Sequence, residues 1–210
     1  MTIAYNAKKP LILASASPRR KELLESINVP FIVAPSDVEE LPRDGEAPVV
    51  HAQRLAEEKA SDVSKKYPAS WILGADTIVV IDGLVLGKPN SEAEAVRMLS
   101  TLAGRTHVVF TGYAILNSRF PEKKTVSCAR SEVFIRELSQ EEIAAYVQTR
   151  EPMDKAGAYA IQGVGAAIVE NVCGSYTNVV GLPLCEVTRD FKKLGIFDFL
   201  GVEAIGKTKS

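Results

Sequence analysis

Residues 11–20 read Leu-Ile-Leu-Ala-Ser-Ala-Ser-Pro-Arg-Arg, an apolar run that stops abruptly at polar residues. The first four residues have the length and bulk of a buried strand. Ser17 and Pro18 form a favoured pair for the N-cap and first position of a helix, which then continues through Ile27. Unpartnered N–H groups and the positive end of the helix dipole attract anions at such a turn. The stretch is therefore predicted to be a phosphate-binding strand-to-helix turn.

Arg19 and Arg20 stand in the first turn of this predicted helix. Cations there oppose the helix dipole, and a purely structural sequence would more often place Asp or Glu at these positions. The alternative is that both arginines are solvated surface residues on an ordinary capped helix. Their unfavourable placement favours a function, namely the binding of an anion that compensates the charge.

Length and charge exclude several classes of protein. The chain has 210 residues, enough to bury a substantial core. Its 25 Lys and Arg residues balance 26 Asp and Glu, so no overall charge steers it toward nucleic acid or an anionic membrane. No apolar run is long enough for a signal-peptide core or a membrane span. We therefore expect a cytoplasmic protein with a local anion site and neither nucleic acid nor membrane as partner.

No repeat, low-complexity run or clear linker divides residues 1–210, which we treat as a single domain. The lead-in from Met1 to Pro10 is expected to be partly frayed and without function, and the tail from about Gly201 to be disordered and dispensable. The odd number of cysteines and the lack of Cys-x-x-Cys spacing argue against a disulfide framework or a zinc site. We expect reduced core thiols at Cys128, Cys173 and Cys185.

Hydrophobic periodicity and turn signals predict the other elements. Strands are expected over residues 30–34, 71–81, 84–86, 106–117, 125–137 and 166–172. Helices are expected over residues 48–67, 91–102, 139–148 and 183–194, with a polar turn at 174–178. Such alternation indicates an α/β fold with a mixed, twisted central sheet flanked by helices.

Lys59 lies on the apolar stripe of the helix predicted from Pro48 to Tyr67. It follows Leu55 by four positions and precedes Val63 by four, so its ammonium is directed toward the body of the protein. The alternative is snorkelling, with the stem on apolar surface and the charge in water. The helix pattern leaves both interpretations open.

Asp76 interrupts the most apolar predicted strand, residues 71–81. A buried carboxylate costs several kcal/mol unless it is paired, hydrogen-bonded, bound to metal or open to a cleft. A structural ion pair is the alternative to a functional role. Gly74 lets a backbone or a ligand approach closely, as expected at the edge of a site.

Four ordered motifs carry a resemblance. Ser15-x-Ser-Pro-Arg-Arg20 is followed by Gly74-Ala-Asp-Thr77, Gly87-Lys-Pro89 and Lys155-Ala-Gly-Ala-Tyr-Ala-Ile-Gln-Gly163. This pattern resembles the Maf family of nucleoside triphosphate pyrophosphatases over almost the whole chain, from about Leu11 to about Val187. The resemblance implies a Maf/ITPase-like fold in which two lobes surround a cleft, and it leaves a homodimer open.

The resemblance also implies the site. Phosphate contacts are expected from Ser15, Arg19, Arg20, Lys59 and Lys88. Asp76 is expected to accept the proton of a water that attacks the α-phosphorus, releasing pyrophosphate. A divalent Mg²⁺ or Mn²⁺ ion is expected between the phosphates and the carboxylates of Asp76 and Glu40. From the sequence alone Glu39 and Glu40 could be plain solvated charges, and Glu39 is the register alternative.

The expected base specificity rests on the same resemblance. Thr77 directly after the aspartate resembles the dTTP/UTP branch, whereas a 7-methyl-GTP branch carries Gln there. Gln162 can pair its amide with the O4 and N3–H edge shared by thymine and uracil. Arg19 also aligns with a specificity position. The alternatives are a modified-nucleotide pyrophosphatase, a phosphatase that releases orthophosphate, and a non-catalytic nucleotide-binding regulator of cell division.

Overall fold

The computed structural model describes residues 4–5, 10–41 and 43–198 of the chain. A seven-stranded sheet has the order β3-β2-β4-β6-β7-β8, with β5 paired to β4. Its strands are β2 (Leu11–Leu13), β3 (Phe31–Val33), β4 (Ile72–Ile81), β5 (Leu84–Leu86), β6 (Thr106–Leu116), β7 (Thr125–Ile135) and β8 (Val169–Cys173). The helices are α1 (Pro18–Ser26), α2 (Pro48–Ser64), α3 (Glu92–Leu102), α4 (Gln140–Gln148), α5 (Tyr176–Val180) and α6 (Leu184–Lys193).

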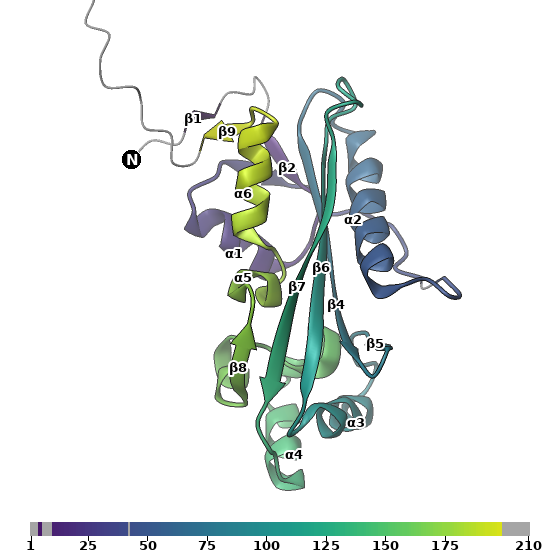
Figure 1. Cartoon of the computed structure of the whole chain (residues 1–210), viewed down its shortest axis with the longest axis vertical. Helices are drawn as coiled ribbons and strands as arrows, with labels where there is room; N and C mark the ends of the chain where they lie inside the picture. The colour runs from purple at the N-terminus through teal and green to yellow at the C-terminus, as the bar shows by residue number, and fades with distance from the viewer. Residues whose placement is uncertain (1–3, 6–9, 42, 199–210) are drawn as a thin grey trace, which may run out of the picture.

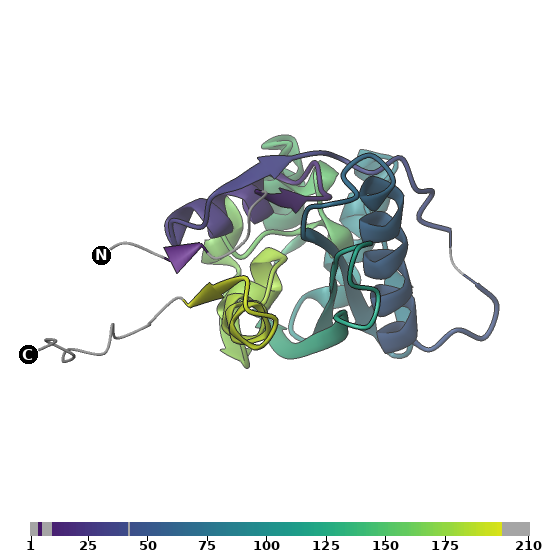
Figure 2. The same cartoon turned by 90° about the horizontal axis from the view of Figure 1, so that it is seen from above.

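The sheet mixes both strand directions. Strand β2 runs parallel to β3 and β4. The pairs β4–β6, β6–β7 and β7–β8 are all antiparallel. The long strands β4, β6 and β7 run through the height of the molecule, and α2 lies on one face of them (Figure 1). Seen from above, α1 and α6 lie away from α2 (Figure 2). The predicted α/β fold with a mixed sheet flanked by helices is confirmed.

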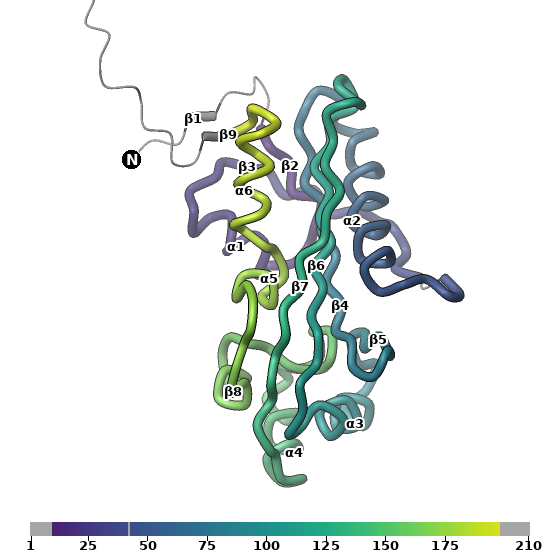
Figure 3. The backbone as a smooth tube through the Cα atoms, viewed as in Figure 1, coloured from purple at the N-terminus to yellow at the C-terminus, as the bar shows by residue number. Residues whose placement is uncertain are grey.

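Two cores at opposite ends of the long strands produce the two lobes. One core joins β2, α1 and α6 to the first half of β4. The other joins α3 and α4 to the second half of β4 and to β6 and β7. The backbone trace shows β4, β6 and β7 continuing from one lobe into the other (Figure 3). The relative position of the lobes is therefore set by shared strands.

Two glycines allow α2 to lie directly on the sheet. A Cβ at Gly74 of β4 would collide with the carbonyl oxygen of Ala56, and one at Gly112 of β6 with that of Ala52. Gly74 was expected to admit a backbone or a ligand, and the structure shows that the partner is the α2 backbone. This close approach brings the α2 side chains over β4.

Several local predictions are wrong. The last predicted strand begins only at Val169, because residues Gly163–Ala167 form a 3₁₀ helix. The predicted polar turn at 174–178 contains the start of α5. The lead-in contributes β1 (Ala4–Tyr5), which pairs with β9 (Phe197–Asp198). The expected disorder of the tail from Gly201 concerns residues outside the described ranges.

The cysteines also differ from expectation. All three thiols are free, but Cys173 and Cys185 are exposed and Cys128 is only half-buried. They are therefore not core thiols. Cys128 and Cys173 lie on strands and Cys185 lies on a helix, and none of the three side chains is buried. Among the described residues, no helix is both long and apolar enough to cross a membrane.

Candidate active site

The cleft lies at a gap in strand pairing along one edge of β4. On that edge β2 pairs with Ile72 and Leu73, and β5 pairs with Val79–Ile81. Between them, Asp76 and Thr77 have no described strand on this edge, although both pair with β6 on the other edge. Ligands of α/β proteins commonly bind beyond the carboxyl ends of parallel strands, where neighbouring connections diverge. The end of β2 beside this gap has that arrangement.

A cavity of about 320 Å³ occupies this place. Its walls come from both lobes, including the loop after β2, the middle of β4 and the segment around Gln162. The structure brings together in this cavity all the residues that were singled out from the sequence, namely Ser15, Arg19, Arg20, Glu40, Lys59, Asp76, Thr77, Lys88 and Gln162. Their placement in one cavity is observed, and their roles stay predictions.

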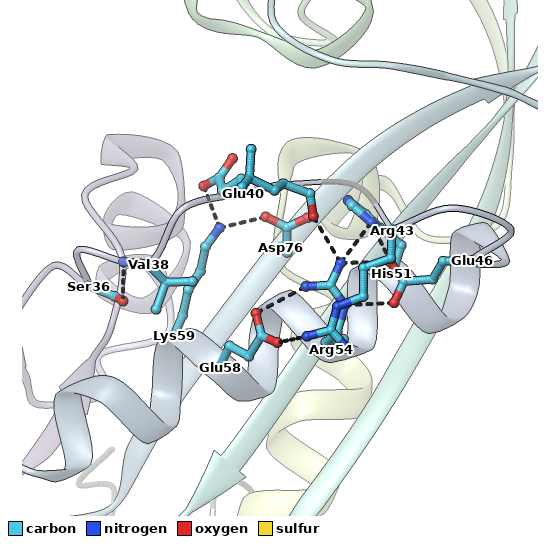
Figure 4. A network of polar contacts seen from close by, with 11 residues as sticks. Ser36, Val38, Glu40, Arg43, Glu46, His51, Arg54, Glu58, Lys59 and Asp76 are labelled. Atoms are coloured by element: carbon cyan, nitrogen blue, oxygen red, sulfur yellow. Dashed lines mark hydrogen bonds and ion pairs between the residues drawn. The ribbon is translucent and has the colours of Figure 1, made fainter.

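Lys59 links two carboxylates at the centre of the cavity. Its Nζ donates to Asp76 Oδ1 and to Glu40 Oε1, each at 2.6 Å (Figure 4). Lys59 and Asp76 are buried, whereas the Glu40 side chain is 50% exposed. The ammonium points inward, as one of the two sequence interpretations required. Asp76 is paired and also faces the cleft, so the two interpretations of its role are compatible.

Charge complementarity favours the ionised form of Glu40. Partial burial would raise the pKa of this carboxyl, but the hydrogen bond and charge of Lys59 outweigh it. The charges of Lys88 and Arg20 act in the same direction, and the net effect is a pKa below the ordinary value. Glu40 is therefore a carboxylate available to a cation.

Arg20 is held entirely by neutral oxygens. Its Nε donates to the carbonyl of Gly181 at 2.8 Å, Nη1 to Ser15 Oγ at 3.0 Å and Nη2 to Thr77 Oγ1 at 3.0 Å. Burial lowers the pKa of this guanidinium, while the charges of Asp76 and Glu40 raise it in part. Because an arginine stays protonated in proteins, a buried positive charge faces the cavity with no carboxylate bonded to it.

The N-terminus of α1 adds to this positive wall. Ser17 occupies the N-cap position, as predicted, but its side chain makes no capping hydrogen bond. Its backbone N–H donates instead to Ser15 Oγ at 3.2 Å. No acidic residue stands in the first turn, so the positive end of the dipole is left for another anion. Lys88, on the opposite lobe, has no hydrogen bond or ion pair with any described residue.

Two contributors were missed by sequence reasoning. Asp154 accepts a hydrogen bond from Arg19 Nη1 at 3.1 Å and another from Lys155 Nζ at 2.6 Å. Gly181 contributes its carbonyl oxygen to Arg20. Asp154 could have been noticed because it directly precedes the small-residue motif. A backbone carbonyl leaves no mark in the sequence.

The cavity lining also includes apolar side chains, which suit contact with an aromatic ring. Val79, Val109, Tyr159 and Val179 line it beside Gln162. The segment that carries Gln162 bends at Gly157, whose φ of +70° favours glycine. The cavity lining thus combines cationic side chains, apolar side chains and the amide of Gln162.

A divalent cation fits the carboxylate pair. Among the described residues, no group of three or more His, Cys, Asp or Glu side chains could form a complete protein cage. Mg²⁺, however, is usually held by one or two carboxylates together with substrate phosphates and water. Glu40 and Asp76 already converge on one cation, the ammonium of Lys59. They are the residues that could hold such an ion.

Comparison with known proteins assigns the family. The family model described as Maf-like protein matches residues 10–194. The chain therefore belongs to the Maf family. A curated relative from Geobacter sulfurreducens, named dTTP/UTP pyrophosphatase, is 52% identical over 90% of this chain and 98% of its own length. A relative of the same name from Syntrophus aciditrophicus is 48% identical over 91% of this chain and 93% of its own.

Solved structures resemble this one only in part. The Ham1 protein of Staphylococcus aureus matches with a TM-score of 0.41 and 16% identity, covering 60% of this chain and 72% of its own.

Proposed function

We propose that this protein hydrolyses dTTP and UTP to the nucleoside monophosphate and pyrophosphate. The observation that carries the proposal is the Asp76–Lys59–Glu40 cluster facing Arg20 across one cavity. In the proposal Asp76 of this cluster is the base, and Asp76 and Glu40 are the carboxylates that bind a cation beside the positive wall. The names of relatives about half identical in sequence support the same activity.

In this mechanism Asp76 accepts the proton of the water that attacks the α-phosphorus. Lys59 keeps Asp76 in place through the 2.6 Å hydrogen bond. The charge that develops on the leaving pyrophosphate is stabilised by Arg19, Arg20 and Lys88, together with the N-terminus of α1. When bound at Glu40 and Asp76, a Mg²⁺ or Mn²⁺ ion would neutralise phosphate charge and polarise the phosphoryl group. No nucleophilic Ser or Cys is required.

Specificity for the base is assigned to Gln162, which lines the cavity together with apolar side chains. Its amide can pair with the O4 and N3–H edge common to thymine and uracil, an edge that cytosine lacks. Leaving such an amide unpaired costs roughly 1–3 kcal/mol, enough for tenfold or greater discrimination. Arg19 helps to orient the nucleotide from the other side of the cavity.

The hydroxyl of Thr77 makes contacts within the protein. That hydroxyl accepts from Arg20 Nη2 and lies 2.9 Å from Thr111 Oγ1. We therefore assign Thr77 the role of leaving room beside the base and fixing Arg20, rather than contacting the base directly. A longer side chain at this position would fill part of the cavity.

Residues 1–210 are proposed to act as one domain. The cavity takes Arg20 from one lobe and Tyr159 and Lys88 from the other, so neither lobe contains the site alone. A cytoplasmic location is proposed with it, because nucleoside triphosphates are found there and the cysteines are free.

The decisive experiment is turnover of a nucleotide panel with Mg²⁺ and with Mn²⁺, in which pyrophosphate is resolved from orthophosphate. We expect dTTP and UTP to be the best substrates, with dCTP and purine triphosphates poorer. Faster turnover of 7-methyl-GTP would overturn the specificity but not the chemistry. Stepwise orthophosphate release would identify a phosphatase, and binding without turnover would identify a nucleotide-dependent regulator.

A further inference from the structure

A second polar cluster lies on α2 beside the active site and contains no residue singled out above (Figure 4). Arg54 binds Glu46 through two hydrogen bonds, from Nε to Oε1 at 2.6 Å and from Nη2 to Oε2 at 2.7 Å. His51 Nδ1 lies 2.9 Å from Glu46 Oε2. Only 13% of the Arg54 side chain and 9% of the Glu46 side chain are exposed. Such a bidentate, largely buried pair is geometrically demanding.

The Arg54–Glu46 pair connects the cluster to the loop that carries Glu40. That loop joins β3 to α2 (residues 34–41 and 43–47), and Glu46 lies near its end. Arg54 Nη2 also donates to the carbonyl oxygen of Leu41 at 3.1 Å. Leu41 directly follows Glu40 in the chain. One guanidinium therefore fastens the loop to α2 at two points.

The rest of the loop gives Glu40 little support. Among the described residues, the only hydrogen-bond partner of the Glu40 side chain is Lys59. Elsewhere the loop is fastened to α2 by Ser36 Oγ and Asp37 N–H, which donate to Asp62 Oδ2 at 3.2 and 3.4 Å, and by the exposed Arg43, whose Nη2 donates to Glu58 Oε1 at 2.9 Å. Without a contact that fixes the loop near Leu41, the half-exposed Glu40 would be bonded to Lys59 for a much smaller fraction of the time.

We propose that Arg54 is a positioning residue, which acts through the Leu41 carbonyl and Glu46 to place the Glu40 carboxylate in the active site. This inference rests on the proposed function, in which Glu40 and Asp76 hold the divalent cation. Both Arg54 and Lys59 stand on α2, so the same helix presents the partner of Glu40 and fixes the loop that delivers it. The glycines that seat α2 on the sheet complete the arrangement.

The test compares Arg54→Ala with Arg43→Ala. Arg43 is the matched control because it belongs to the same cluster and bonds Glu58, yet its side chain is 64% exposed and has no hydrogen bond or ion pair with Leu41 or Glu46. Outer partners of metal-binding groups typically contribute 10–100-fold to affinity or activity. We expect Arg54→Ala to lower kcat and raise the Mn²⁺ concentration for half-maximal activity by about tenfold or more. Arg43→Ala should change neither by more than about twofold.

A double-mutant cycle with Glu40→Gln separates positioning from a merely structural role. If Arg54 acts through Glu40, Arg54→Ala should cost little further activity in the Glu40→Gln background. An equal loss in both backgrounds would overturn the proposal, as would equal effects of Arg54→Ala and Arg43→Ala. Glu46→Gln keeps the size of the side chain and serves if Arg54→Ala fails to fold. It should give the same change in Mn²⁺ dependence and the same coupling to Glu40→Gln.

Hydrogen exchange tests the positioning role of Arg54 separately from the proposed hydrolysis of triphosphates. Arg54→Ala should speed amide exchange in residues 36–41, whereas Arg43→Ala should not. This readout requires no turnover. A wild-type protein that hydrolyses no triphosphate would contradict the proposed function alone, while unchanged exchange in residues 36–41 of Arg54→Ala would contradict the positioning role.

Discussion

Two buried cations lie on either side of β4, and they are partnered in opposite ways. Lys59 comes from α2 and bonds two carboxylates, Asp76 and Glu40. Arg20 comes from α1 and bonds only neutral oxygens, including those of Thr77 and Gly181. Asp76 and Thr77 are neighbours on one strand and face opposite sides of it, which is why each cation meets a different partner.

This contrast divides the cavity into an anionic and a cationic part. One ammonium and two carboxylates leave a net negative charge around Lys59, which is where we propose that a divalent cation binds. The guanidinium of Arg20 has no bonded counter-ion, so an anionic ligand can provide one. Both parts are needed for a triphosphate that carries about four charges together with a metal ion. Four changes test the division, from the largest expected effect to the smallest.

Asp76→Asn removes a carboxylate while keeping the size of the side chain. The amide can neither accept the water's proton nor bind a metal ion well, and a general base is typically worth about 10²–10⁴-fold in rate. We expect kcat for dTTP to fall by that range with the fold intact, because Lys59 keeps Glu40 as a partner. Steady-state kinetics with thermal unfolding as control would show this. Turnover close to wild type would exclude Asp76 as the base.

Lys59→Ala tests the same part of the cavity from the cationic side. Removing one partner of a buried ion pair leaves an uncompensated charge and costs about 3–5 kcal/mol, so unfolding at lower urea is expected together with loss of hydrolysis. The double variant Lys59→Ala with Asp76→Asn should recover much of the stability but no activity. If Lys59→Ala lowers stability while kcat and KM are unchanged, the lysine has a purely structural role.

Arg20→Lys tests the cationic part. Lysine keeps the charge but cannot reach Gly181, Ser15 and Thr77 together, since it lacks the planar fork. Unsatisfied buried acceptors cost about 1–3 kcal/mol, and we expect a stability loss of roughly 2–3 kcal/mol with weaker triphosphate binding. Lys21→Ala is the matched control, because Lys21 lies next to Arg20 in the chain and is exposed. Equal urea midpoints for the two variants would mean that the oxygens around Arg20 contribute nothing.

Local pattern predicted most of the elements that build this cavity. The Ser139–Glu142 capping box forms reciprocally at the start of α4. The Asp82-Gly83 hairpin signal lies where both residues take positive φ. Both features depend on residues that are close together in the chain, so they can be predicted from the local sequence. Helix periodicity placed Lys59 on the apolar stripe but left its inward direction open against snorkelling, and the contact with Asp76 shows that it points inward.

Long-range partners could not be predicted. The acceptor of Arg20 Nε is a backbone carbonyl 161 positions away, and every residue has such a carbonyl. The short helix α5 was missed because its N-cap Ser175 follows Gly174, and the pair is equally typical of a turn. The Arg54–Glu46 pair was missed because charged residues off an apolar stripe are usually solvated. Tertiary contacts, rather than local propensity, decided each of these.

His107 is a buried side chain that, unlike Arg20, can lose its proton, so it shows how burial favours the neutral form. Its Nε2 lies 2.7 Å from the Tyr159 hydroxyl, and Nδ1 is buried without a hydrogen-bond partner in the described part of the chain. Burial lowers the pKa of this imidazole to about 4. Like Arg20, His107 has only neutral partners. Unlike Arg20, it can become neutral, so of these two buried side chains only Arg20 carries a permanent charge.

The sign of the pH effect follows from this lowered pKa. The unfolded chain, with an ordinary histidine pKa of 6.5, binds the proton more readily than the folded protein does. The contribution of neutral His107 is therefore complete above about pH 6.5 and decreases as pH falls toward 4. At pH 5 the loss should be about 2 kcal/mol. Urea unfolding of the wild type and of His107→Gln at pH 7.5 and pH 5 measures it, because the variant lacks the titrating group but can still bond Tyr159. Parallel pH dependence in the two proteins would mean that the buried imidazole accepts its proton without cost, and that neutral partners suffice to hold a buried cation.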